Sequence, residues 1–381
     1  MAKVKFGDVV KEYKGKIDQK NNPYEFYVAG DHMDTDDLTI RRKGRFATDD
    51  VGPAFIREFK KGQVLYGSRR TYLRKIAVAD FDGVTANTTF VLETKDEGVL
   101  RQRLLPFIMY TESFTEWSIK KSKGSTNPYV LFKDLADYEF ELPDIDKQDE
   151  LVELLWSMND AKDAYNNLIV SIDELVKSEF LEIIQPLLDQ ENTVPLDDMV
   201  EDDRPITYGI VKPGHGFPGG VPVVKVKDMR DGVIDQSDLL LTTPELDYQY
   251  RRSRLREGDL LLSIRGSVGR MAEVPASLEN ANITQDTARL SIKPEYNKLY
   301  VRGVLESQPL QYDMEQNIRG VAVKGINIGY LREVKMPVCS KAKQDHLANM
   351  YQQGNKSIIE LRKAMSEMTA VYKRIIQDNL T

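Results

Sequence analysis

One segment of this chain occurs twice, and the repeat limits the folds open to it. The stretch EFKKGQVLYGSRRTYLRKIAV (58–78) aligns with LREGDLLLSIRGSVGRMAEV (255–274) after a shift of 196 positions. This shift places Gly62 on Gly258, Leu65 on Leu261, Arg69 on Arg265 and Arg74 on Arg270. KVKFGDVV (3–10) likewise resembles TVPLDDMV (193–200), and a Lys-Gln-Asp triplet follows a proline late in each half. A period of about 190 residues is too long for a solenoid and indicates a duplicated domain.

Each half begins with short β-rich runs and ends with a long helix. The runs QVLYG, TTFVLE, VPVVKV and DLLLSI are bounded by Gly, Pro, Asn and Asp turn signals, which predicts mixed, strand-rich lobes. Apolar residues then recur every three or four positions over about five heptads, which is typical of a coiled coil. The stripe residues expected at a helix–helix or partner interface are Leu151, Leu155, Met158, Ile169, Ile172, Val176, Leu347, Ile358, Leu361, Met365 and Met368.

The order of these segments predicts an α+β fold with a pseudo-twofold internal repeat. We expect mixed α/β lobes over residues 1–143 and 193–337, and long helices over residues 144–192 and 338–381. About 36 helical residues at ~1.5 Å each form a rod of roughly 54 Å. Two such rods, each following an equivalent lobe, most simply pack as an antiparallel coiled coil with the lobes at opposite ends.

Composition narrows the class of protein. The chain is 41% hydrophobic and 30% charged, has one cysteine (Cys339), and contains no apolar run of ~18 residues or signal-peptide pattern, so we expect a cytoplasmic protein. The net charge of −7 is unevenly distributed, because residues 144–203 carry 18 acidic side chains and three lysines, which leaves +8 for the remainder. That remainder contains the basic clusters RRKGR (41–45), RRTYLRK (69–75), IKKSK (119–123) and RRSRLR (251–256), so a nucleic-acid-binding face is possible.

No motif predicts a catalytic centre. The chain lacks GxxxxGK[ST], His-x-x-x-His and Cys-x-x-Cys, and its three histidines fall in unrelated contexts, so we expect neither catalytic nor metal-binding residues. Asp82, Glu93 and Lys95 follow the loose spacing of metal-dependent nucleases, although the second half has no match to it. A nuclease is therefore the rarer alternative.

Recognition of DNA fits the basic clusters better. Lysine and arginine position a protein on phosphates, arginine also reads guanine with two hydrogen bonds, and Asn or Gln reads adenine. Two lobes related by a pseudo-twofold axis would contact two half-sites about one helical turn, or ~34 Å, apart. The candidate DNA-binding residues are Arg69, Arg70, Arg74, Lys75, Lys120, Lys121, Lys123, Tyr208, Arg265, Ser267, Arg270, Gln285, Arg319 and Lys324.

The sequence resembles the specificity (S) subunit of type I restriction-modification systems. ITYGIVKPG (206–214) and GGVPVVKVKDMRDGVI (219–234) are similar to the opening of a target recognition domain of that family, and YGSRRTYLRKIAV (66–78) is similar to its middle. The stretches Pro143…Gln148 and Pro337…Gln344 are similar to the segments that lead into the family's two helices. The resemblance covers essentially the whole chain and implies that the two lobes are target recognition domains separated by spacer helices.

The resemblance also implies a function. A specificity subunit reads a bipartite site in double-stranded DNA and has no catalysis of its own. Its expected partners are modification (methyltransferase) subunits, two of them, and restriction subunits. S-adenosylmethionine would then be the cofactor of the modification subunit, and this chain would hold none. The alternative that the residues leave open is a coiled-coil scaffold whose lobes bind protein partners.

Overall fold

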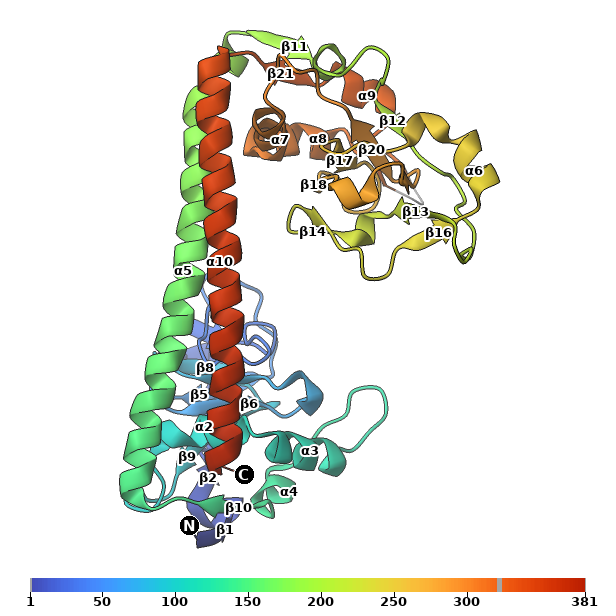
Figure 1. Ribbon diagram of the computed structural model, residues 1–381. Helices are drawn as coiled ribbons and strands as arrows, with labels where there is room; N and C mark the ends of the chain where they lie inside the picture. The colour runs from blue at the N-terminus through green and yellow to red at the C-terminus, as the bar shows by residue number, and fades with distance from the viewer. Residues whose placement is uncertain (1, 321–323, 381) are drawn as a thin grey trace. The chain divides into compact units, whose positions relative to one another are not determined.

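The computed structural model describes residues 2–320 and 324–380, and it divides into two compact units (Figure 1). The first unit comprises Met1–Asn167 and Arg362–Thr381, and the second comprises Leu168–Leu361. Each unit contains a strand-rich lobe and a part of each of two long helices, so the predicted α+β mixture is confirmed. Within the described ranges, no helix combines the length and the apolar character needed to cross a bilayer.

Two four-stranded sheets form the lobe of the first unit. The antiparallel sheet has the order β2 (Val10–Glu12), β9 (Thr89–Thr94), β6 (Val64–Gly67), β7 (Ile76–Val78). The other sheet has the order β4 (Gly44–Arg45), β3 (Phe26–Val28), β8 (Gly83–Ala86), β5 (Phe55–Phe59), and β3 runs parallel to β8. A short ribbon pairs β1 (Ala2–Lys5) with β10 (Glu139–Leu142).

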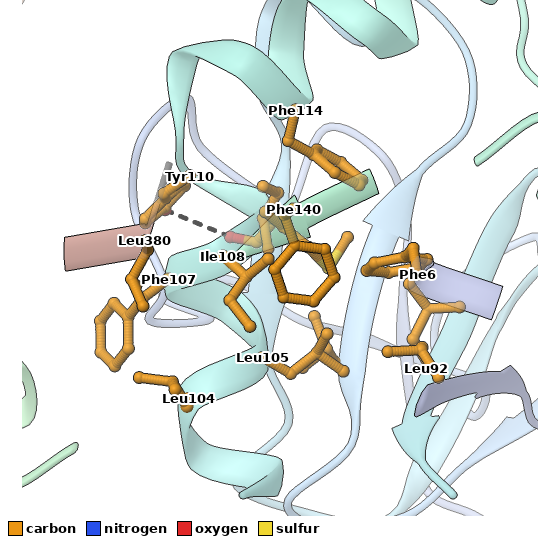
Figure 2. Packing of buried hydrophobic residues seen from close by; sticks show 14 of the residues in the cluster. Phe6, Leu92, Leu104, Leu105, Phe107, Ile108, Tyr110, Phe114, Phe140 and Leu380 are labelled. Atoms are coloured by element: carbon orange, nitrogen blue, oxygen red, sulfur yellow. Dashed lines mark hydrogen bonds between the residues drawn. The ribbon is translucent and has the colours of Figure 1, made fainter. Parts of the chain in front are cut away.

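Strands β6 and β9 are buried on both faces, which explains why their sequences are almost continuously apolar. Because side chains alternate along a strand, Val64 and Leu92 belong to one hydrophobic cluster whereas Leu65 and Val91 belong to another. The larger cluster is completed by residues from four short helices, α1 (Phe6–Val9), α2 (Leu105–Met109), α3 (Glu112–Lys121) and α4 (Phe132–Ala136). Figure 2 shows Phe107 of α2 and Phe114 of α3 within it.

The lobe of the second unit contains a comparable antiparallel sheet. Its order is β12 (Thr207–Tyr208), β20 (Thr287–Leu290), β17 (Leu260–Ser263), β18 (Met271–Glu273). A second sheet has the order β16 (Leu240–Thr242), β13 (Val221–Val224), β19 (Asn282–Ile283), with β13 parallel to β19. Two ribbons pair β14 (Met229–Arg230) with β15 (Val233–Ile234), and β11 (Thr193–Pro195) with β21 (Lys335–Pro337). The shorter helices are α6 (Pro244–Gln249), α7 (Lys298–Glu306), α8 (Gln308–Gln316) and α9 (Ile328–Glu333).

The two long helices are α5 (Ile145–Asp189) and α10 (Lys341–Leu380), and each contributes to both units. In the first unit, the ring of Phe107 packs edge-on against Trp156 of α5 and Tyr372 of α10, with ring centroids 5.4 Å and 6.0 Å away. In the second unit, Phe180 of α5 packs against Tyr351 of α10 at 6.2 Å. Within each unit, therefore, a part of α5 lies against a part of α10.

All eleven predicted stripe residues are buried or half-buried. Three of them also contact a lobe, because Leu151 and Leu155 belong to the hydrophobic core cluster of the first lobe and Leu347 to that of the second. These clusters also contain residues of the other long helix, namely Ile376 and Leu380 of α10 in the first and Phe180 and Ile184 of α5 in the second, so the predicted helix–helix interface stays a prediction for these three residues. The apolar stripe that was predicted to face the other helix therefore also packs the beginning of each long helix against a lobe.

Candidate nucleic-acid interface

In the first unit, the predicted basic residues come together on two adjacent loops. The bridge Arg69–Tyr129 joins the loop that follows β6 to the hairpin that follows α3, and the bridge Lys123–Tyr129 closes that hairpin. Val130 N donates to Ser68 O at 3.0 Å, and Arg70 N donates to Pro128 O at 2.7 Å. We call residues 68–75 with residues 119–130 the first loop pair.

In the second unit, the loop after β17 meets the loop after α8 in the same way. The bridges here are Arg265–Gly325 and Arg319–Gly325. Ile326 N donates to Ile264 O at 2.9 Å, and Gly266 N donates to Lys324 O at 3.3 Å. Residues 264–270 with residues 316–320 and 324–326 form the second loop pair.

The two loop pairs use the same backbone bonds at a constant sequence offset. Every bridge and hydrogen bond of the second pair named above follows its counterpart in the first by 196 residues. The hairpin glycines obey the same rule, since Gly124 (φ +90°) and Gly320 (φ +114°) both adopt the left-handed conformation that a residue without Cβ tolerates. The 196-residue offset that the sequence shows for residues 58–78 therefore also relates the later loops of the two pairs, which lie about 50 residues further along the chain. Sequence similarity does not reveal the offset in these later loops.

Two cations of the first loop pair, Arg69 and Lys120, are free to meet a ligand within the described part of the chain. Arg69 and Lys120 are exposed and their side chains have no partner among the described residues. Lys121 lies over the ring of Trp117 at 4.7 Å, and Lys123 pairs with Asp134 at 3.0 Å, which lowers the pKa of that carboxyl. Two exposed tyrosines that the sequence analysis did not select, Tyr72 and Tyr129, also lie on these loops.

Arg74 and Lys75 have partners inside the fold. Arg74 is half-buried, its Nε donates to Asp36 Oδ1 at 2.6 Å, and its Nη2 donates to Tyr110 O at 2.8 Å. Lys75 Nζ donates to Gly30 O. These contacts favour a structural role for both residues over the predicted contact with DNA.

In the second loop pair, Arg270 and Lys324 are exposed, with no side-chain partner in the part of the chain that the structure describes. Arg319 Nη1 donates to the carbonyl oxygens of Gln316 and Ile318. Arg265 lies 4.0 Å from Asp286, and Ser267 is exposed at the tip of the loop.

The remaining two predicted residues lie beside the second loop pair. Gln285 precedes Asp286, whose carbonyl oxygen accepts a hydrogen bond from Ile264 N at 2.8 Å. Tyr208 is exposed on β12, at the edge of the four-stranded sheet. Both residues therefore lie on segments outside the two loops, and their contact with DNA stays a prediction.

A further basic and aromatic segment was not included among the predicted site residues. Tyr248 on α6 is exposed, and the guanidinium of Arg251 lies 4.8 Å from the centre of its ring. Arg289 is fully buried and fixes the backbone of this segment, because it donates hydrogen bonds to the carbonyl oxygens of Arg252 and Arg254. It also donates to the carbonyl oxygen of Pro205. Burial lowers the pKa of Arg289 to about 10. The cluster RRSRLR was the available signal, but nothing in it distinguishes exposed from buried arginines.

The residues of the nuclease pattern have separate partners. Asp82 accepts from Lys61 N at 2.8 Å, Glu93 accepts from Gln63 Nε2 at 2.7 Å, and Lys95 Nζ donates to Gly7 O. Across the described residues, no three His, Cys, Asp or Glu side chains are grouped in a way that could hold a metal ion. The geometry therefore gives the nuclease alternative no support.

Comparison with known proteins shows which family of proteins the sequence is similar to. Residues 1–170 match the model of the type I restriction modification DNA specificity domain. The chain is 32% identical over 161 residues to the type I restriction enzyme EcoBI specificity subunit of Escherichia coli, covering 42% of this chain and 33% of that protein. It is 25% identical over 176 residues to the EcoDI specificity subunit of the same organism, covering 45% and 38%. The matches thus span less than two-fifths of the length of either relative.

Solved structures show the fold. A chain from work on complex assembly and conformational transition of the type I R-M system has a TM-score of 0.56 at 18% identity, covering 99% of this chain and 96% of that one. The type I restriction-modification system S subunit from M. genitalium has a TM-score of 0.58 at 13% identity, covering 100% and 96%. The resemblance to type I specificity subunits is therefore confirmed, and it is carried by the match of residues 1–170 to the model of the type I restriction modification DNA specificity domain and by the EcoBI relative.

Proposed function

We propose that the chain is a DNA sequence-specificity subunit of a type I restriction-modification complex, and that it has no catalytic activity of its own. Each lobe would contact one half of a bipartite site through its loop pair. The observation that carries the proposal is that both lobes build the same two-loop surface, at a constant offset of 196 residues, and place exposed cations on it.

The chemistry of these surfaces suits a DNA duplex. Unpaired cations such as Arg69 and Arg270 can displace the counterions of phosphates, which is the main source of affinity for DNA. Arginine can also donate two parallel hydrogen bonds to the O6 and N7 atoms of guanine in the major groove. Because the loops of the two lobes differ in sequence, each lobe would read a different half-site.

We further propose that the lobes are duplicated target recognition domains spaced by α5 and α10 packed as an antiparallel coiled coil. Contacts within each unit support this arrangement. In the second unit, a Cβ added at Gly354 of α10 would come within 2.7 Å of Val176 Cγ2 on α5, so the two backbones approach closely. Helices shared by both units would hold two readers at a fixed spacing on DNA.

The proposed partners follow from the family. Modification subunits, two of them, would bind this chain and methylate adenine with S-adenosylmethionine, and restriction subunits would join that complex. Exposed apolar residues on the long helices, among them Leu175 and Ile359, are candidates for contacts with these proteins. A scaffold whose lobes bind only protein is the alternative, and the following experiment separates the two.

Selection from a pool of duplexes with a randomised centre, using the full chain alone and with any co-purifying modification subunit, tests the proposal. We expect a two-part consensus whose binding weakens steeply with salt. Arg69→Ala and Arg265→Ala should each weaken binding to the selected duplex by about 1–3 kcal/mol if they read bases, whereas a phosphate contact would weaken all duplexes alike.

The matched control is Lys363→Ala, which removes an exposed cation from α10 outside both loop pairs and should leave binding unchanged. Protein capture without sequence-selective DNA binding would favour the scaffold. Metal-dependent cleavage by the isolated chain would instead favour the nuclease, with Asp82, Glu93 and Lys95 as the residues to test.

A further inference from the structure

Arg70 adopts a backbone conformation that arginine disfavours. Its φ and ψ are +50° and +54°, in the left-handed region, where the Cβ atom of any residue except glycine crowds the following carbonyl group. The residue at the same position of the second loop pair, 196 places later, is Gly266 with φ +73°. One lobe therefore places glycine, and the other places arginine, at a position that favours glycine.

The left-handed conformation is required by the loop and not by the side chain. In the first loop pair, Arg70 N donates to Pro128 O at 2.7 Å and Arg70 O accepts from Leu73 N at 2.8 Å, which starts the next helical turn. In the second pair, Gly266 N donates to Lys324 O in the same way. A Cβ added at Gly266 would meet nothing within 4 Å, so there is open space for a side chain at this position.

The contacts of Arg70 within the fold do not account for its presence. The side chain is exposed, and Nε donates to Asn127 Oδ1 at 3.3 Å, which is a long hydrogen bond. Arg74 provides a contrast, because it is also left-handed (φ +48°) but is half-buried and bonded to Asp36 and Tyr110 O. In Arg74 the strain is offset by contacts inside the lobe. In Arg70 it is not, which is typical of residues kept for function.

We propose that Arg70 is a specificity-determining residue of the first lobe and contacts a guanine in its half-site. The long bond from Nε to Asn127 Oδ1 would turn the guanidinium toward one direction without holding it rigidly. The terminal nitrogens Nη1 and Nη2 would remain for two parallel hydrogen bonds to O6 and N7 of the base. Gly266 gives the second lobe no equivalent contact, so the two half-sites would differ at this base. This inference rests on the proposed function.

Two variants separate a contact with DNA from a role in folding. Arg70→Gly removes the side chain and relieves the backbone strain, whereas Arg70→Ala removes the side chain and keeps the strain. We expect Arg70→Gly to melt at the same temperature as the wild type or higher, and Arg70→Ala to melt no higher than the wild type. Arg74→Gly is the matched control: it also relieves strain but loses internal contacts, so it should melt lower.

Both Arg70 variants should weaken binding to the duplex that the wild type selects by about tenfold to a hundredfold. Selection from the randomised pool should then lose its preference for guanine at one position of one half, while the other half stays unchanged. An unchanged consensus would show that Arg70 does not read a guanine, and a fall in melting temperature like that of Arg74→Gly would show that its side chain serves the fold. If the wild type selects no sequence at all, the proposed function fails first and the inference with it.

Discussion

At the scale of single residues, Glu58 of β5 illustrates how hydrogen-bond donors lower the pKa of a carboxyl group. Glu58 accepts hydrogen bonds from the hydroxyls of Tyr13 and Tyr24, and Lys60 Nζ lies 3.0 Å from its carboxylate. Since these donors stabilise the charged form, they lower the pKa of Glu58 to about 2, and the bond to Glu58 raises the pKa of Tyr13 to about 12. The cluster ties three segments of the first lobe together.

We expect Glu58→Gln to destabilise the protein at neutral pH by up to about 3 kcal/mol. The pKa of Glu58 is lower in the folded than in the unfolded chain, so its contribution is complete above pH 4.5 and disappears as the pH falls toward 2. Urea unfolding of the wild type and the variant at pH 7 and at several acidic pH values measures the difference. Glu25→Gln, at a more exposed ion pair, is the control and should change little. A difference that stays constant with pH would refute the assignment.

The sequence predicted equivalent positions where the two halves could be aligned, but it could not predict contacts that depend on three-dimensional context. The sequence repeat identified Arg69 and Arg265 as equivalent residues, and the structure places them at equivalent positions of the two loop pairs. The same alignment selected Arg74, but it could not show the ion pair with Asp36 because that partner lies 38 residues away. The strain at Arg70 was equally invisible, since the backbone angles of a loop depend on the segment against which it packs.

At the scale of secondary-structure elements, long and local patterns were the most predictable. The apolar stripes indicated two long helices, and the structure has them at Ile145–Asp189 and Lys341–Leu380. The parallel pairs β3–β8 and β13–β19 were not predictable. Each joins strands about 60 residues apart, so the pairing is decided by the packing of the lobe and not by local sequence.

Gly354 provides a test of the close approach between α5 and α10 inside the second unit. Glycine in a helix interior is less stable than alanine by about 1 kcal/mol, so Gly354→Ala would stabilise an isolated helix. Here the added Cβ would come within 2.7 Å of Val176 Cγ2, and we expect a net loss of about 1–3 kcal/mol from overpacking.

The double variant Val176→Ala/Gly354→Ala should recover part of this loss, because the shortened side chain makes room for the new methyl group. Thermal unfolding of the two single variants and the double variant gives the coupling between the positions. Additive effects, or stabilisation by Gly354→Ala alone, would mean that the helices are not in contact at this point.

At the scale of the whole molecule, the two units divide the chain differently from the predicted domains. The sequence favoured boundaries at the ends of the helices, near residues 143, 192 and 337, where the strand-rich lobes meet the helical apolar stripes. The compact units instead divide within both helices, at residues 167 and 361, because each part of a helix packs on the lobe beside it. A lobe and the part of each helix beside it therefore form one compact unit, and exchanging a lobe must preserve that contact.

Exchange of residues 204–337 for the equivalent lobe of another family member tests whether the chain reads two separate half-sites. The cores of the two lobes contain different residues, so the exchange should leave the first lobe folded, provided that the donor keeps apolar side chains facing Phe180, Ile184 and Leu347. We expect the pattern of methylated adenines, mapped in cells that contain the modification subunit, to change in one half of the site and remain the same in the other. The reciprocal exchange of residues 1–143 is the control and should change only the opposite half. If either exchange altered both halves together, the lobes would not act as independent readers, and the duplicated loop pairs would have to serve one continuous recognition surface.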